Sequence, residues 1–285
     1  MQYRGENRME YRKALPADLA GCAALFDGVF GGGEALAHTV LEQFAGPGRV
    51  YLADGEAGPQ AVLCAVPVTL KGRPGAYLYG LATAPAHRGR GVMSGLIEHA
   101  CADLAQQGLA FAALVPEGPA LFAFYQKRGF QKAFGRRRLC RTVRHNLWAQ
   151  AEFDTVTAKH WQALRGQYMP DSVTLTPAGA VVVLTDLYSC GLTIVSSPEG
   201  YGMYFAKGDT MRFIELFAEG DRAAERLMEA ARERERAERA EITLGAEQPL
   251  FLGEGTAQDY GMIRFLGQPF DVSGCYMGNM LDEEG

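Results

Sequence analysis

The sequence has 285 residues, 48% of them hydrophobic and 21% charged, and its formal net charge is −5. These values are ordinary for a globular protein, so no long disordered segment is expected, and the length suffices for two domains. The densest basic segment is the short run Arg136-Arg137-Arg138, and no stretch approaches 18 consecutive apolar residues. We therefore expect neither a nucleic-acid partner nor a membrane span.

The six cysteines are widely spaced along the chain. This spacing excludes the close pairs of a redox motif or a zinc knuckle, and a free thiol in an apolar run behaves as a small hydrophobic group. The N-terminal run Met1–Glu6 is polar and contains no apolar signal segment. We expect a reducing, cytoplasmic location and no bound metal.

The first half of the chain predicts a mixed α/β domain over residues 10–145, preceded by a flexible tail over residues 1–9. Apolar spacing and Gly/Pro turns define its elements. In chain order we predict a helix opened by Pro16–Asp18 and reaching Val29, a helix from Glu34 to Phe44, an antiparallel meander over 49–53, 60–70 and 76–83, a helix over 92–107, a strand over 109–115, a helix over 119–127, and a strand pair from Phe130 to about Val143. The long helix would cross over between two parallel strands.

The second half repeats part of this order. The same reasoning predicts strands over 192–195, 202–206 and 211–217, a helix over 221–240 and a strand over 241–244. Three strands, a helix and a strand also occur in the first half. We therefore predict a second α/β domain over residues 146–285, built as a degenerate copy of the first.

The segment between the third strand and the long helix has the composition of a phosphate site. The strand ends at Thr83, and Gly89 and Gly91 precede the helix that begins at Val92. The start of a helix has unpaired N–H groups and a partial positive charge, and glycines let a phosphate approach the main chain. Arg88 and Arg90 add permanent charge beside it. The alternative is an exposed turn that needs glycine for its geometry alone.

Other glycine-rich motifs do not fit this segment. A dinucleotide-binding fingerprint would need a glycine where Ser94 stands, and the chain has no Gly-Lys-Ser or Gly-Lys-Thr of a P-loop. Ser94 also lacks the flanking glycines of a nucleophile elbow, because Val92 occupies the first of those positions.

The turn resembles motif A of the GNAT acetyltransferase superfamily, Q/R-x-x-G-x-G/A, with Arg88, Gly91 and Met93 at its three defined positions. Met93 replaces the usual small residue, as in the subgroup named for enhanced intracellular survival. Downstream, the run from Phe124 to Phe130 is similar to the second GNAT signature, a tyrosine followed by a Gly-Phe strand start. The asparagine often found seven residues before the tyrosine is replaced by Gly118. The resemblance covers roughly residues 10 to 143.

The resemblance implies a GNAT acyl-CoA N-acyltransferase fold followed by a degenerate GNAT-like half. It implies acetyl-CoA as cosubstrate, with a bulge in the fourth strand that separates it from the fifth, and Tyr125 as the proton donor to the CoA thiolate. The other reading of Tyr125 is an ordinary half-buried aromatic residue. The cofactor-binding residues implied are Leu81, Ala82 and Thr83 for the pantetheine arm, and Arg88, Gly89, Arg90, Gly91, Val92 and Met93 for the pyrophosphate.

The acceptor implied is a primary amine, on a small molecule or a peptide, that attacks acetyl-CoA directly in a ternary complex. Its general base is open, because the strand over 76–83 carries no carboxylate. A water relay, Glu34 and the C-terminal carboxylate of Gly285 are the alternatives, and the last resembles the enhanced-intracellular-survival subgroup. The competing functional interpretation is a sensor or scaffold that binds acyl-CoA and catalyses little. The oligomeric state is left open.

Overall fold

The computed structural model describes residues 9–56 and 58–281, and the chain divides into two compact units. The first unit runs to Gln131 and takes in Met262–Phe270, and the second contains Lys132–Gly261 and the chain from Asp271 onward. The division therefore lies earlier than the predicted boundary at residue 145, and neither unit is one continuous segment. The predicted tail falls outside the described residues except for Met9, which packs against the core of the first unit.

The first unit begins with a short strand, two helical segments and a long meander. Its elements are β1 (Glu10–Lys13), the 3-10 turn η1 (Pro16–Asp18), α1 (Leu19–Phe30), α2 (Gly33–His38), the π-helical turn η2 (Thr39–Ala45), β2 (Val50–Gly55), β3 (Gly58–Leu70), β4 (Arg73–Thr83), the 3-10 turn η3 (Pro85–His87), α3 (Val92–Gln106), β5 (Phe111–Leu114) and α4 (Pro119–Gln126). Sequence analysis predicted most of these within a few residues but missed β1, which has only four residues.

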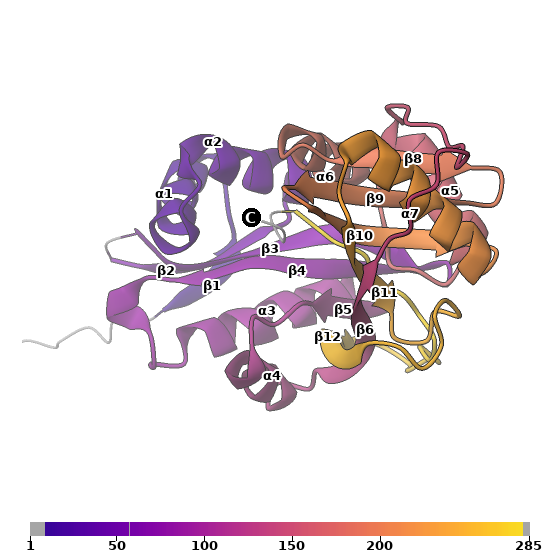
Figure 1. The fold of residues 1–285 in the computed structure, drawn as a ribbon. Coiled ribbons are helices and arrows are strands. Elements are labelled where there is room, and N and C mark those ends of the chain that lie inside the picture. Colours follow the sequence, from indigo (N-terminus) through magenta and orange to yellow (C-terminus); the bar gives the residue numbers. More distant parts are fainter. Residues whose placement is uncertain (1–8, 57, 282–285) are drawn as a thin grey trace, which may run out of the picture. The chain divides into compact units, whose positions relative to one another are not determined.

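The sheet of the first unit is mixed. Strands β1 to β4 are antiparallel neighbours in chain order, and β5 lies parallel to β4 after the crossover through α3. The residues Met262–Phe265, from the strand β12 (Thr256–Phe265), pair antiparallel with β5. Figure 1 shows α1 and α2 on one face of β1–β4 and α3 and α4 on the other. The predicted mixed α/β class is confirmed.

The main core of this unit lies between α3 and the sheet. Leu96, Ile97, Ala100 and Leu104 project from one side of α3 and are at most 1% exposed. They recur at helical spacing, which is why the sequence pattern predicted this helix and its buried face. The core therefore fixes α3, and with it the glycine-rich turn that leads into the helix.

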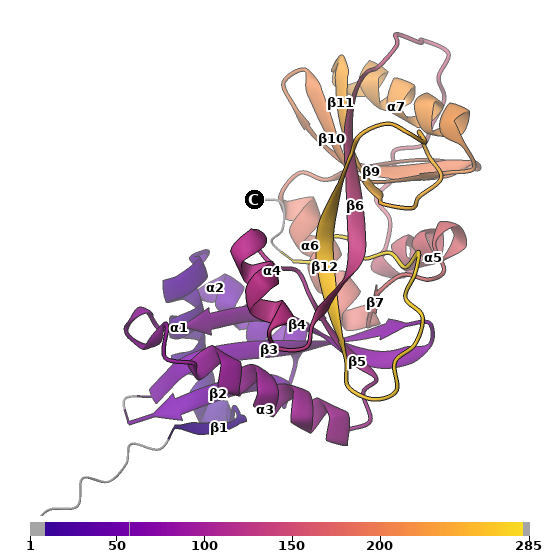
Figure 2. The ribbon, with the colours of Figure 1, turned by 90° about the horizontal axis from the view of Figure 1, so that it is seen from below.

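The second unit contains two helices that sequence analysis missed and a second meander that it found. Its elements are β6 (Gln131–Thr142), α5 (Ala158–Tyr168), β7 (Thr174–Leu175), α6 (Pro177–Ser189), β8 (Thr193–Ser197), β9 (Gly200–Lys207), β10 (Thr210–Ala218), α7 (Asp221–Glu235) and β11 (Arg239–Gly245). Strands β8, β9 and β10 are antiparallel, β11 is parallel to β10, and β6 is antiparallel to β11. Figure 2 shows α7 on one face of this sheet and α5 and α6 on the other.

Two predicted elements were wrong in extent. The predicted strand pair from Phe130 to Val143 is the single strand β6, because the chain does not turn back and pairs instead with β11. The predicted helix over 221–240 ends at Glu235, because Arg236 adopts a left-handed conformation with φ 59°. The alternating Arg and Glu residues there favour a helix, so they gave no signal for its end.

Among the described residues, no single helix is long and apolar enough to cross a membrane. Only the pair Pro16–Phe30 and Gly33–Ala45, bent by 118°, meets the length and composition requirement together.

Candidate functional site

A gap opens in the sheet of the first unit where β4 separates from β5. The two strands pair at Gly75, Ala76 and Tyr77, and β5 does not follow β4 beyond this point. On its other side, β4 stays paired with β3 as far as Thr83. The β4 edge past Tyr77 can therefore offer backbone groups to an extended ligand, as a strand edge does in β-augmentation.

A one-residue bulge in β4 lies at the start of this gap. Between the pairs Cys64–Tyr79 and Val62–Ala82, β4 has two residues, Gly80 and Leu81, where β3 has one. Gly80 has φ 61°, and a Cβ there would lie 2.6 Å from the ring of Phe26. The position thus requires glycine for both conformation and space. Sequence analysis did not single out Gly80, although a glycine inside a strand is a signal for a bulge.

The turn after β4 has the geometry of an anion site. Gly89 and Gly91 have φ 73° and 79°, and no atom lies within 4 Å of the position that a Cβ would take at either residue. Gly91 is the N-cap of the 15-residue helix α3, and no side chain caps that helix end. The first-turn amides of α3 therefore face an open surface, and Arg88 and Arg90 are both exposed beside it.

The turn and the bulged strand are directly connected. Arg88 Nε donates to the Thr83 carbonyl at 3.1 Å, which ties the turn to the end of β4. Leu81 and Met93 are partly buried and pack against the core of this unit. The core packing of Met93 explains how a bulky residue fits at the position where motif A usually has a small one. The structure thus brings the predicted residues of β4 and of the turn together, and these residues fit the phosphates and extended arm of a CoA molecule.

Tyr125 lies near the end of α4 and is 7% exposed. Its ring makes edge contacts with Phe124 and Phe130, at centroid distances of 5.1 and 5.8 Å. Burial raises the pKa of Tyr125 to about 12, while the nearby charge of Arg128 acts in the opposite direction. The phenol is therefore protonated at neutral pH and can donate a proton.

The Gly-Phe pair of the second signature forms the cap of α4. Gly129 has φ 77°, its N–H donates to the Gln126 carbonyl at 3.1 Å, and the Phe130 N–H donates to the Tyr125 carbonyl at 3.2 Å. This is the pattern of a glycine-terminated helix end. The signature residues thus hold the tyrosine by its backbone and by ring packing, which is a physical reason for their spacing.

Two arginines that sequence analysis did not consider contact α3 close to the turn. Arg128 donates through Nε to Ser94 Oγ at 3.0 Å, and Arg264 forms an ion pair with Glu98 at 2.7 Å. The spacing of the signature places Arg128 beside Tyr125 and could have suggested it. Arg264 could not be found in this way, because it is 136 residues distant from Arg128 in sequence.

The carboxylates considered as a general base are not brought to Tyr125 by any described contact. Glu34 lies on α2, its side chain is 86% exposed, and its Oε1 lies 3.5 Å from Nε2 of His38. The carboxylate of Gly285 lies outside the described residues. No group of three or more His, Cys, Asp or Glu residues in the described part of the chain could hold a metal ion.

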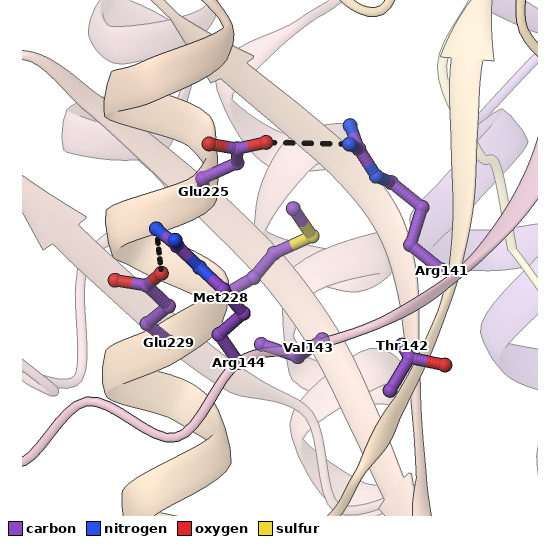
Figure 3. Close-up of a pocket in the computed structure, with 7 residues that line it drawn as sticks. All are labelled: Arg141, Thr142, Val143, Arg144, Glu225, Met228 and Glu229. Carbon is purple, nitrogen blue, oxygen red and sulfur yellow. Dashed lines mark hydrogen bonds and ion pairs between the residues drawn. The ribbon is translucent and has the colours of Figure 1, made fainter.

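The second unit contains a hollow of about 330 Å³ between β6 and α7. Two ion pairs frame it, Arg141 with Glu225 and Arg144 with Glu229, each at 3.3 Å, and Met228 points into the space between them (Figure 3). Each arginine is thus neutralised by a glutamate. The hollow therefore does not have the excess positive charge that a polyphosphate ligand would need, unlike the turn before α3.

Comparison with known proteins identifies the family that the first unit matches. Residues 10–133 match the sequence model of a family described as acetyltransferase (GNAT) domain. The resemblance indicated by the two motifs is thus confirmed, and this part of the chain is a GNAT domain. Such a domain supports an acyltransferase activity with an acyl-CoA as donor. No curated protein gave a significant sequence match.

Solved structures extend the likeness to both units. A probable N-acyltransferase of Enterococcus faecalis is 15% identical with a TM-score of 0.75, and the match covers 92% of this chain and 73% of that one. A GCN5-related N-acetyltransferase of Anabaena variabilis is 16% identical with a TM-score of 0.72, covering 91% and 73%. For Eis1 of Mycobacterium abscessus the values are 17%, 0.65, 90% and 74%. At these identities the likeness concerns the fold.

Proposed function

We propose that this protein is an N-acetyltransferase that moves the acetyl group of acetyl-CoA to a primary amine by direct attack in a ternary complex. The observation that carries the proposal is the separation of β4 from β5 at the Gly80 bulge, next to the open, glycine-capped start of α3. The first provides a strand edge for the pantetheine arm. The second provides amides for the pyrophosphate.

Each part of the site then has a role in the reaction. Acetyl-CoA supplies a thioester whose carbonyl carbon is attacked by the amine nitrogen. A backbone amide in the segment Leu81–Thr83 would donate to the carbonyl oxygen and stabilise the negative charge that develops on it. As the carbon–sulfur bond breaks, the Tyr125 hydroxyl would donate its proton to the departing thiolate. The attacking nitrogen loses a proton to a base, for which a water relay, Glu34 and the C-terminal carboxylate of Gly285 are the alternatives.

The alternative is an acyl-CoA sensor or scaffold with the same fold. The observation that favours it is that the described residues place no carboxylate on β4, so a built-in base is missing from that strand. In this interpretation Tyr125 only fills the core. Both functions share the cofactor site, so they differ in the consequence of changing Tyr125.

The proposal also includes the acceptor class, the location of the protein and the role of the second unit. The partner is a small-molecule or peptide amine. We place the protein in the cytoplasm, in keeping with its six cysteines, all of which are free thiols. We also propose that the second unit binds no cofactor and shapes the choice of acceptor.

The test is acetyl transfer from acetyl-CoA to a panel of small amines, aminoglycosides and peptides, measured for the wild type and Tyr125→Phe. We expect Tyr125→Phe to lower kcat by roughly 10²–10⁴-fold, the range of general acid catalysis, with little change in acetyl-CoA binding. Because the pKa of Tyr125 is about 12, the acid form persists through neutral pH, and loss of this proton should not limit kcat near pH 8. If Tyr125→Phe keeps wild-type turnover while chemistry limits the rate, Tyr125 is not the general acid and serves only in packing.

A further inference from the structure

Arg264 connects α3 to the end of α4. Its Nη1 and Nη2 atoms donate to the two carboxylate oxygens of Glu98 at 2.7 and 2.8 Å. Nη1 also donates to the Arg128 carbonyl at 3.0 Å. Glu98 lies in the second turn of α3, and Arg128 follows α4 by two residues. One guanidinium, brought in by a distant part of the chain, thus holds two helices of the first unit in fixed relation.

Arg128 makes a second connection between the same helices. Its Nε donates to Ser94 Oγ at 3.0 Å, its Nη2 contacts the same oxygen, and its Nη1 donates to the Phe124 carbonyl. The guanidinium carbon lies 3.4 Å from the centre of the Phe124 ring, so the group also stacks on that ring. Ser94 is the third residue of α3. This connection therefore reaches the turn of the helix at which the phosphates of the cofactor would bind.

Helix α4 is short, and Phe122 and Phe124 pack beside Tyr125 against the core of the first unit. The helix has eight residues, and Tyr125 is its only buried one. A helix this short is not stable by itself, and its position is set by tertiary contacts. The two arginines bind backbone carbonyls on either side of Tyr125: Arg128 binds that of Phe124, and Arg264 binds that of Arg128. They therefore act on the backbone segment that carries the phenol, in addition to the ring contacts of Tyr125 with Phe124 and Phe130.

We propose that Arg128 and Arg264 are positioning residues, which hold the Tyr125 hydroxyl in a fixed place relative to the first turn of α3. This inference rests on the proposed acetyl transfer and deepens it. Both arginines act through the tyrosine in this scheme, and neither needs to touch the substrate.

The ion pair is suited to this role and contributes little to the fold. The side chains of Arg264 and Glu98 are 23% and 53% exposed, and pairs this accessible contribute little to stability. The Arg264 guanidinium lowers the pKa of Glu98, so the pair stays charged at neutral pH. Replacing Arg264 should therefore loosen α4 without unfolding the unit, and the effect can be measured on the intact chain.

The experiment compares Arg264→Gln in the wild-type background and in Tyr125→Phe. Transfer from acetyl-CoA is measured with hydroxylamine as acceptor, because this small nucleophile is largely uncharged at neutral pH and requires no base. CoA binding is measured by calorimetry. The matched control is Arg226→Gln, which breaks an exposed arginine–glutamate pair, with Glu199, in the second unit. Glu98→Gln removes the same connection from the other side, and it replaces Arg264→Gln if that variant fails to fold.

We expect Arg264→Gln to lower kcat by about tenfold to a hundredfold, the scale of a small misplacement of a catalytic group. The KM for acetyl-CoA and the affinity for CoA should stay nearly unchanged. In Tyr125→Phe the same substitution should cause no further loss, because the group it positions is already absent.

Two results would overturn the inference. One is unchanged turnover in both Arg264→Gln and Glu98→Gln. The other is an equal loss in both backgrounds, which would mean that the arginine acts independently of Tyr125. Failure of the proposed function is visible separately, since Tyr125→Phe alone would then keep wild-type turnover, or the wild type would bind no CoA.

Discussion

The two units share one run of elements but differ at the place where the first would bind its proposed cofactor. The run consists of three antiparallel strands, a helix of 15 residues and a strand parallel to the third of them: β2–β4, α3 and β5 in the first unit, and β8–β10, α7 and β11 in the second. Each third strand also has a one-residue bulge, at Gly80–Leu81 in β4 and at Ile214 in β10. The arrangement of strands and helix around the proposed cofactor site of the first unit therefore has a counterpart in the second. The two units differ in the groups that lie at the helix start and in the gap between the parallel strands.

The helix starts show the first difference. The start of α3 has open glycines and two arginines, whereas α7 begins with Asp221, whose Oδ1 accepts from the Phe251 N–H at 2.7 Å. A carboxylate at a helix start is favourable for the helix and repels a phosphate. Gly220, before α7, has φ 174°, an extended conformation open to any residue. The second helix start is thus occupied by its own chain.

The gap between the parallel strands shows the second difference. Strands β10 and β11 pair only as far as Phe213 and Ile242. Beyond that point, Gln248 Nε2 donates to the Leu216 carbonyl of β10, and Gln248 Oε1 accepts from the Gly245 N–H of β11 at 3.1 Å. A side-chain amide of the second unit thus bonds a carbonyl of one separated strand and an N–H of the other, where the first unit would bind the pantetheine arm of its proposed cofactor.

A buried arginine keeps this segment in place. Arg137 donates to the carbonyls of Gln248, Leu250, Phe251 and Glu254 at 2.6 to 3.0 Å. Four carbonyl acceptors around one guanidinium fix the path of the loop that carries Gln248. A shared framework thus does not imply a shared ligand, because a loop of the second unit lies where the first unit would hold its proposed cofactor.

The largest expected effect is on CoA binding at the first helix start. The double variant Arg88→Glu, Gly91→Glu replaces an open, positive surface with two carboxylates. We expect CoA affinity to fall by roughly a hundredfold or more, since a charge-assisted hydrogen bond contributes about 1.5–3 kcal/mol and about 1.4 kcal/mol is tenfold. Calorimetry measures the loss. The matched control is Gly220→Glu, Arg222→Glu at the start of α7, and a comparable loss there would contradict the assignment of the site to the first unit.

The next effect concerns the stability of the second unit. Gln248 is 4% exposed, so Gln248→Ala leaves the Leu216 carbonyl and the Gly245 N–H without this partner. We expect the free energy of unfolding to fall by about 2–4 kcal/mol, the cost of two buried unpaired groups. Denaturant titration measures it, with the exposed Gln131→Ala as control. The wild type should bind one CoA per chain, and a stoichiometry of two would show that this amide does not keep CoA out of the second unit.

The sequence predicts the glycine-rich turn before α3 and the helix that carries Tyr125 better than the partition of the chain into units. Gly89, Gly91 and Tyr125 belong to local motifs, and local motifs depend on residues close together in sequence. The contact of Gln248 with Leu216 and the contact of Arg264 with Glu98 instead join residues that are 32 and 166 positions apart in the sequence. Helices α5 and α6 were not predicted, because they lie outside the repeated order of three strands, a helix and a strand. Short-range patterns cannot show which distant strand completes a sheet, so the return of Met262–Phe265 beside β5 was not predicted.

A smaller effect is expected at the bulge of β4. Gly80→Ala forces a side chain into a left-handed conformation and places a Cβ 2.6 Å from Phe26. We expect a loss of roughly 1–3 kcal/mol in the free energy of unfolding, together with weaker CoA binding as the strand edge shifts. Gly28→Ala in α1 is the control, because that glycine is helical and its Cβ would meet nothing within 4 Å. Equal stability of the two variants would show that the bulge does not depend on glycine.

The smallest expected effect distinguishes two features that could keep CoA out of the second unit, Asp221 at the start of α7 and Gln248 between β10 and β11. Asp221→Ala removes the acceptor of the Phe251 N–H at the start of α7, and we expect a loss of about 1 kcal/mol in the free energy of unfolding, the typical net contribution of one hydrogen bond. The variant should still bind a single CoA, because removing the negative charge leaves Gln248 between β10 and β11. If Asp221→Ala gains a second CoA, then charge at the helix start, and not the side-chain amide in the gap, keeps the cofactor out of this unit. Calorimetric stoichiometry on Asp221→Ala and on Gln248→Ala, each beside the wild type, decides between these causes.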